Sequence, residues 1–188
     1  MKKIITVFFV FNLLVSVFAG EIKDIMSIPF GASHDEVNTI MITKNFMKAS
    51  DCRISFDTYG GAYDIVQYDY GTFAGRTNVT MYVYFFQDRM YCMEAYGGGS
   101  WQTVLDAYIS KYSLTNKKTN SKAYYDEKDN YVLLTTMIWE SGIRIGNMEI
   151  NNQLVDYADN YEKELERKKQ EELERCRKAE LNTINGDI

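Results

Sequence analysis

The distribution of apolar and polar side chains along the chain predicts a sheet of aromatic strands. In the segment 79–86, VTMYVYFF, every second residue from Val79 to Phe85 is Val, Met or Phe, and threonine and tyrosine stand between them. Side chains alternate between the two faces of a strand, so this pattern is typical of an antiparallel sheet with one deeply buried face. Further stretches of strand composition, bounded by turn residues, are 63–70, 90–96, 124–126, 131–139 and 143–150.

Two segments have the spacing of amphipathic helices. Ser33 and Glu36 form a capping box, and apolar residues follow at helical spacing within 34–46. Ser100 is a good N-cap for a second helix, because an apolar stripe follows in 104–112. The order helix, strands, helix, strands indicates an α+β fold. We expect an antiparallel sheet with two helices on one face, built as tandem α-β-β units, followed by a C-terminal charged helix.

The C-terminal segment 158–188 differs sharply from the rest, with seven basic and nine acidic side chains and a single aromatic residue. Oppositely charged residues four positions apart, in the order that favours a helix, are Glu164/Lys168, Glu171/Arg175 and Glu174/Lys178. We therefore predict a helix from Tyr161 to about Leu181. It is either a solvated helix or one that binds a partner or dimerises, and the sequence leaves both interpretations open.

The first nineteen residues have the layout of a secretory signal peptide. Lys2 and Lys3 precede an apolar run that is too short for a stable membrane span, and Val17-Phe18-Ala19 suit a cleavage site. We expect an exported protein, periplasmic or secreted, whose mature chain starts near Gly20 and has no transmembrane span. The predicted organisation is a signal peptide at 1–19, an α+β globular domain at 20–157 and a charged helical tail at 158–188.

Charge and composition exclude several kinds of chemistry. The 188-residue chain has a formal net charge of −5 and a pI of about 5.0, which argues against nucleic-acid binding. His34 is the only histidine, so His-pair zinc sites are excluded, and at a helix start we expect a solvent-exposed side chain rather than a catalyst. Gly97-Gly98-Gly99-Ser100 lacks the residues of a P-loop and predicts a connector. Asp126 to Asn130 misses the EF-hand spacing and predicts a hairpin turn. We expect no metal and no cofactor.

Three cysteines remain in the predicted mature chain, Cys52, Cys92 and Cys176. Export permits disulfides, so an intramolecular Cys52–Cys92 bridge is one interpretation and three unpaired thiols are the other. Cys176 is in the charged tail, where it is a candidate for a free or intermolecular thiol.

Tyrosines in the predicted strands are the candidates for a binding face, because tyrosine combines a large contact area with one polar end. It is equally common in ordinary sheets, so a structural role is the alternative. The candidate residues are Tyr68, Tyr70, Tyr82, Tyr84 and Tyr91.

The segment Ile28 to Val37 resembles the PFG-x-S-x-x-E-V opening of many small exported bacterial proteins of unknown role. Further positions that match this pattern include Phe73-Ala74-Gly75, Trp139 and Leu154-Val155-Asp156-Tyr157. The layout also resembles the tandem α-β-β folds of outer-membrane assembly factors of the BamE/SmpA type and of β-lactamase inhibitor proteins. These resemblances imply an exported α+β fold and bring no catalytic residues with them.

The function that we expect is that of an exported, non-enzymatic binding or envelope-associated module that recognises a protein or envelope component. One alternative is a secreted hydrolase that uses carboxylates such as Asp64, Asp69 or Glu94. The other is an inhibitor of an exported enzyme, which the resemblance in fold suggests.

Overall fold

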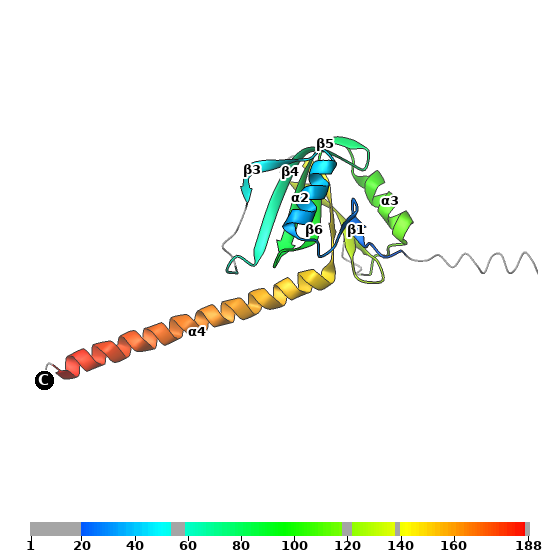
Figure 1. The fold of residues 1–188 in the computed structure, drawn as a ribbon. Helices are drawn as coiled ribbons and strands as arrows, with labels where there is room; N and C mark the ends of the chain where they lie inside the picture. Colours follow the sequence, from blue (N-terminus) through cyan, green and yellow to red (C-terminus); the bar gives the residue numbers. More distant parts are fainter. Residues whose placement is uncertain (1–19, 54–58, 118–121, 138–139, 187–188) are drawn as a thin grey trace, which may run out of the picture.

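A computed structural model of the chain describes residues 20–53, 59–117, 122–137 and 140–186, with the backbone alone at 50–53 and 180–186 (Figure 1). The predicted signal peptide at 1–19 lies outside the described residues. The elements are β1 (Asp24–Ile25), β2 (Ile28–Pro29), α2 (His34–Thr43), β3 (Met47–Arg53), β4 (Tyr63–Phe73), β5 (Arg76–Phe86), β6 (Arg89–Tyr96), α3 (Gln102–Tyr112), β7 (Ala123–Tyr125), β8 (Tyr131–Met137), β9 (Glu140–Gly146) and α4 (Met148–Gly186).

Seven strands form one antiparallel sheet in the order β3-β4-β5-β6-β9-β8-β7. Two meanders, β3 to β6 and β7 to β9, meet where β6 pairs with β9. Two-residue turns with positive φ at both positions close the hairpins at Ala74-Gly75 and Gln87-Asp88, as the right-handed twist of the strands requires. The predicted α+β fold is confirmed. Each helix is followed by a longer meander than the expected β-hairpin, of four strands after α2 and three after α3.

Helices α2 and α3 cover one face of the sheet, together with the short β1-β2 hairpin (Figure 1). Val37 and Met41 of α2 and Val104 and Leu105 of α3 are buried in the same cluster as the apolar face of the strands. The capping box that the sequence predicts at Ser33 is present, with Glu36 completing it.

The start of α3 differs from the prediction. Its N-cap is Trp101, without a side-chain capping bond, and Ser100 Oγ accepts instead from Gln102 N at 3.3 Å. Trp101 is 1% exposed, stacks on Phe73 and donates its indole N–H to Gly97 O. The buried Trp101 ring fixes the backbone at this point. The helix therefore begins one residue later than it would with Ser100 as its N-cap.

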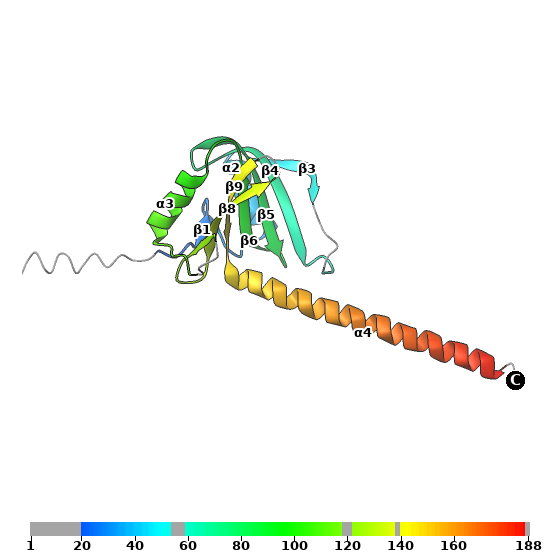
Figure 2. The same cartoon turned by 180° about the vertical axis from the view of Figure 1, so that it is seen from behind.

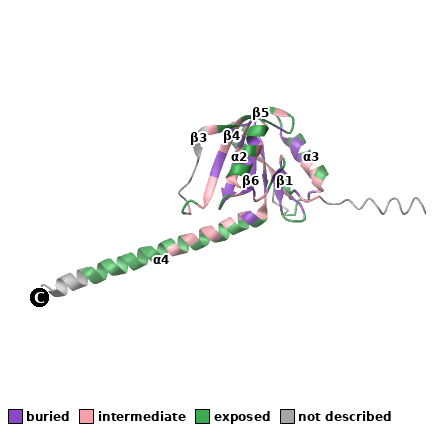
Figure 3. Cartoon of the chain, viewed as in Figure 1, coloured by how far each residue is buried: buried purple, intermediate pink, exposed green. Residues whose placement is uncertain are grey.

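The C-terminal helix α4 begins thirteen residues before the predicted start at Tyr161, inside the segment that the sequence assigned to the globular domain. Ile150, Leu154 and Tyr157 lie on one stripe of this helix and pack against the lower end of the sheet. The exposure of α4 rises along its length, and every described side chain from 165 onward is exposed (Figure 3). Among the described helices, none has the length and apolar character needed to cross a membrane. Dimerisation through the tail stays a prediction.

Candidate functional site

The face of the sheet opposite α2 and α3 is crossed by α4 only at its lower end (Figure 2). Strand register places Tyr82, Glu94, Arg144 and Leu133 side by side on β5, β6, β9 and β8. We call this surface the open face. It carries the polar and aromatic side chains that alternate with the apolar core residues along each strand.

A buried carboxylate lies at the centre of the open face. Glu94 is 5% exposed, and its Oε2 accepts the hydroxyls of Tyr84 at 2.6 Å and Tyr96 at 3.0 Å. Arg144 Nη1 lies 3.4 Å from Glu94 Oε1. Burial, helped by the bond to Glu94, raises the pKa of Tyr84, and burial raises the pKa of Tyr96 to about 12. Both phenols therefore stay protonated donors, and the carboxylate has the partners that a buried charge requires.

The Arg144 guanidinium is held from several sides. Its Nε lies 3.2 Å from Cys92 Sγ, and the group sits over the Tyr84 ring at 5.3 Å from the centroid. Tyr131 donates its hydroxyl to the same sulfur at 3.8 Å. Burial raises the pKa of the Cys92 thiol, so the sulfur is a neutral acceptor. The side chain of Arg144 is 32% exposed, which leaves part of this fixed cation at the surface.

Of the two interpretations of the cysteines, the Cys52–Cys92 bridge is not formed in the structure. Cys92 is a free, buried thiol on β6, and two strands, β4 and β5, lie between β6 and β3 in the sheet order. Cys52 belongs to β3, and its side chain lies outside the described residues. Cys176 is an exposed free thiol on α4.

The structure brings together three of the five candidate tyrosines. Tyr82 and Tyr84 share the open face, and a β-bulge, in which Tyr91 is the extra residue of β6, places Tyr91 beside them. Tyr68 is 1% exposed and points into the core on the opposite face. Tyr70 is 70% exposed at an irregularity of β4, where its φ is 63°. Tyr68 and Tyr70 are therefore not part of one tyrosine face.

Sequence reasoning missed Arg144 and Tyr131 as members of this surface, and it placed Glu94 only among possible hydrolase carboxylates. The alternation of side chains along each strand could have identified these residues. Glu94 stands between Met93 and Ala95, whose side chains are buried in the core. Arg144 stands in the same way between two buried isoleucines. A lone charge between two core residues must point to the other face.

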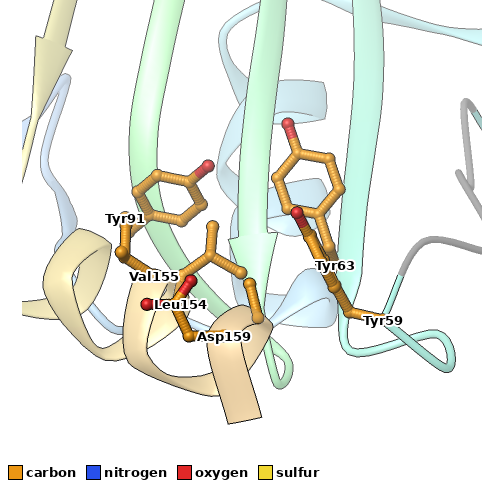
Figure 4. A pocket seen from close by; sticks show the side chains of 7 residues that line it. Tyr59, Tyr63, Tyr91, Leu154, Val155 and Asp159 are labelled. Carbon is orange, nitrogen blue, oxygen red and sulfur yellow. The ribbon is translucent and has the colours of Figure 1, made fainter. Parts of the chain in front are cut away.

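A cavity of about 510 Å³ lies where α4 passes the open face (Figure 4). Tyr59, Tyr63 and Tyr91 line it from the side of the sheet. The α4 side chains that complete the lining are Leu154, Val155, Ala158 and Asp159.

A smaller cavity of about 340 Å³ lies near the first turn of α4. Lys122 and Arg144 line it together with Tyr131 and Asn151.

His34 lies on the covered face and is not the solvent-exposed side chain that the sequence predicted. Its side chain is 26% exposed and stacks on Phe85, with ring centroids 3.7 Å apart. Nδ1 lies 2.5 Å from Asp88 Oδ1, and Nε2 lies 3.0 Å from Asp64 Oδ2. Because both ring nitrogens face carboxylates, the imidazole ties α2 to β4 and to the β5-β6 turn.

The three carboxylates considered for hydrolysis do not converge on one site. Asp64 faces His34 on the covered side, whereas Asp69 bonds Gln67 and Thr80 on the open face. Glu94 is enclosed by its tyrosine and arginine partners. Among the described residues, no group of three or more His, Cys, Asp or Glu side chains has the geometry of a metal site.

Asp126 organises the β7-β8 turn rather than a calcium loop. Its carboxylate accepts the backbone N–H groups of Ile22, Lys128 and Asn130, each within 2.9 Å. The predicted hairpin turn is confirmed, and the bond to Ile22 ties the start of the described chain to this turn.

Comparison with known proteins finds no matching family model, no matching curated protein and no matching solved structure. The geometry of the chain itself therefore carries the functional argument.

Proposed function

We propose that this protein is an exported, non-enzymatic module that binds a protein or envelope component through its open face. One observation carries the proposal: half-exposed tyrosine and polar side chains from adjacent strands are fixed around the buried Glu94 and its partner Arg144, on the face that neither α2 nor α3 covers.

Rigidity of these side chains supports recognition. Tyr84 and Tyr96 are bonded to Glu94, and the Tyr82 ring packs edge-on against Tyr96 at 5.9 Å. Side chains that are already ordered lose little conformational entropy when a partner binds. Tyrosine and arginine are also enriched among the residues that dominate binding energy at interfaces.

Substitutions on the open face test this function. We expect Tyr82→Arg and Leu133→Glu, each at a half-exposed position, to abolish capture of a partner crosslinked in intact cells. Tyr70→Arg is the matched control, because Tyr70 is 70% exposed at the irregularity of β4 and is not among the residues bonded around Glu94. Capture that survives both open-face substitutions would refute the proposal, provided that the variants unfold at the same temperature as the wild-type protein.

Export is tested separately by mass spectrometry, which identifies the N-terminal residue of the protein recovered from a cell envelope fraction. We expect a mature chain that begins near Gly20. Recovery of the intact chain from the cytoplasm would contradict export while leaving the binding face to be tested by itself.

A further inference from the structure

The cavity beside α4 differs from the open face in both shape and chemistry. Tyr91 lies on one side of it and Tyr59 and Tyr63 lie on the other, with the α4 side chains closing it below (Figure 4). Its volume of about 510 Å³ falls within the range of small-molecule sites, and its wall on α4 includes the apolar residues Leu154, Val155 and Ala158.

Several contacts hold the walls of this cavity in place. Tyr157 packs on Phe86 with ring centroids 5.5 Å apart, which docks α4 against the sheet. Tyr161, one turn further along α4, meets Tyr59 edge-on at 6.3 Å. The loop that carries Tyr59 is also tied to the β5-β6 turn, because Gln87 N donates to Ala62 O at 2.8 Å. The three tyrosines therefore belong to walls that are formed without a ligand.

The aromatic walls favour a positive charge. Burial raises the pKa of Tyr63 and of Tyr91, so both rings remain neutral phenols with electron-rich faces. A cation within about 6 Å of such a face is attracted by the ring quadrupole, and more strongly where water is partly excluded. An anion at the same place would be repelled.

The formal charge of the residues that line the cavity also favours a cation. Asp159 is the one charged residue among the described residues that line the cavity. The α4 segment that lines it, 154–159, contains two acidic residues and no basic residue. A carboxylate beside aromatic rings, with apolar side chains opposite, suits an organic cation whose alkyl groups contact the apolar wall.

We propose that this cavity binds an alkylammonium group. The group is either that of a free quaternary amine or that of a lysine side chain. This binding goes beyond recognition by the open face and uses a different set of side chains, because neither Glu94 nor Arg144 lines the cavity and Tyr91 is the one candidate tyrosine that the two sites share.

Titration of the full mature chain with matched probes tests the charge preference. Choline is compared with 3,3-dimethyl-1-butanol, which has the same shape without the charge, and n-butylammonium represents a lysine side chain. We expect at least one of the two ammonium ions to bind at least about tenfold more tightly than the neutral alcohol. Preference for choline indicates a free quaternary amine, and preference for n-butylammonium indicates lysine. Equal binding of ion and alcohol, or no binding of either ion, overturns the proposal.

Variants locate the site. We expect Tyr63→Leu to weaken ammonium binding about fivefold or more and Tyr63→Phe, which keeps the ring, to change it less than about twofold. Asp159→Asn should weaken binding several-fold at low salt and less at high salt. The controls are Tyr70→Leu and Asp106→Asn, both at exposed positions outside the cavity. Unchanged affinity in both Tyr63→Leu and Asp159→Asn would overturn the assignment to this cavity. Loss of partner capture in the open-face variants, with ammonium binding intact, would separate the two proposals.

Discussion

The two faces of the sheet bury different kinds of side chains. On the covered face, Val79, Met81 and Val83 are fully buried beneath α2 and α3, and the surroundings are almost wholly apolar. On the open face, the intervening side chains lie around a buried carboxylate whose partners come from three strands. The same strands thus carry an apolar core on one side and a hydrogen-bonded polar layer on the other.

This difference shows which face contributes stability and which is available for function. Apolar burial is the main source of folding free energy, whereas a buried charge with its partners contributes little net stability. A polar layer ordered in this way keeps its side chains in defined positions without a covering helix. The covered face therefore holds the fold, and the open face can present a fixed surface.

The largest expected effect comes from truncating one side chain on each face of β5. Met81→Ala leaves a cavity in the core and should lower the free energy of unfolding by about 3 kcal/mol, because Met81 is fully buried. Tyr82→Ala, at the next position, should cost only about 1 kcal/mol, since its ring is half-exposed. Urea denaturation measures both values. Equal losses would remove the energetic distinction between the faces.

A slightly smaller loss of stability is expected when a methyl group is added at Gly142, against the polar layer of the open face. A Cβ at Gly142 would lie 2.3 Å from Ala95 O and 2.7 Å from the Tyr96 ring, so Gly142→Ala should cost about 2 to 3 kcal/mol. Gly98→Ala is the control, because nothing lies within 4 Å of a Cβ there. Thermal unfolding of both variants is the measurement, and a stable Gly142→Ala protein would show that Tyr96 is not packed over this glycine.

The Glu94–Arg144 pair provides the third test. Arg144→Met should cost about 2 kcal/mol, below the value for a fully buried pair because Arg144 is 32% exposed. In a Glu94→Gln background the same substitution should cost about 1 kcal/mol less, since no carboxylate is left without its cation. A double-mutant cycle by denaturant unfolding measures this coupling. Additive losses would mean that the two side chains do not interact.

The smallest effect concerns pH at the covered face. The backbone N–H and ring of His34 donate to Asp88 and lower the pKa of that carboxyl. A lowered pKa in the folded state stabilises the protein above pH 4, and the stabilisation is lost as the pH falls below about 4. Asp88→Asn should therefore be less stable than the wild-type protein at pH 7, by less than about 1 kcal/mol because Asp88 is 64% exposed.

Unfolding temperatures of the wild-type protein and Asp88→Asn, measured at pH 7, 5, 4 and 3, test this difference in stability. Asp106→Asn, at an exposed position away from His34, controls for a general change in charge. The difference between wild type and Asp88→Asn should narrow as the pH falls below 4. A difference that stays constant down to pH 3 would contradict the role of the hydrogen bonds from His34 to Asp88.

Local patterns were sufficient for much of the fold. The alternation in 79–86 separates Met81 from Tyr82 correctly, and the capping box places the start of α2. The position of Tyr91 was not predictable in the same way, because it depends on a bulge that sets β6 against β5. Arg144 reaches Glu94 only because β6 pairs with β9, and this contact between strands distant in sequence has no local signal.

The helix α4 also shows that composition placed a helix start too late. Charge content changes near residue 158, and the predicted helix start at Tyr161 followed that change. The backbone forms one helix from Met148 to Gly186. Helical spacing of Ile150, Leu154 and Tyr157 was the better guide, because a helix continues through a change of composition as long as its backbone bonds are unbroken.

The length of α4 gives the molecule a reach. From Tyr161, its last aromatic contact with the body, to Gly186 the helix spans about 37 Å at 1.5 Å per residue. Arg167 bonds Glu164 and Glu171 at exposed positions, which supports the helical backbone between these residues. A molecule bound at the C-terminal end of α4 would therefore be held at a fixed distance from the open face.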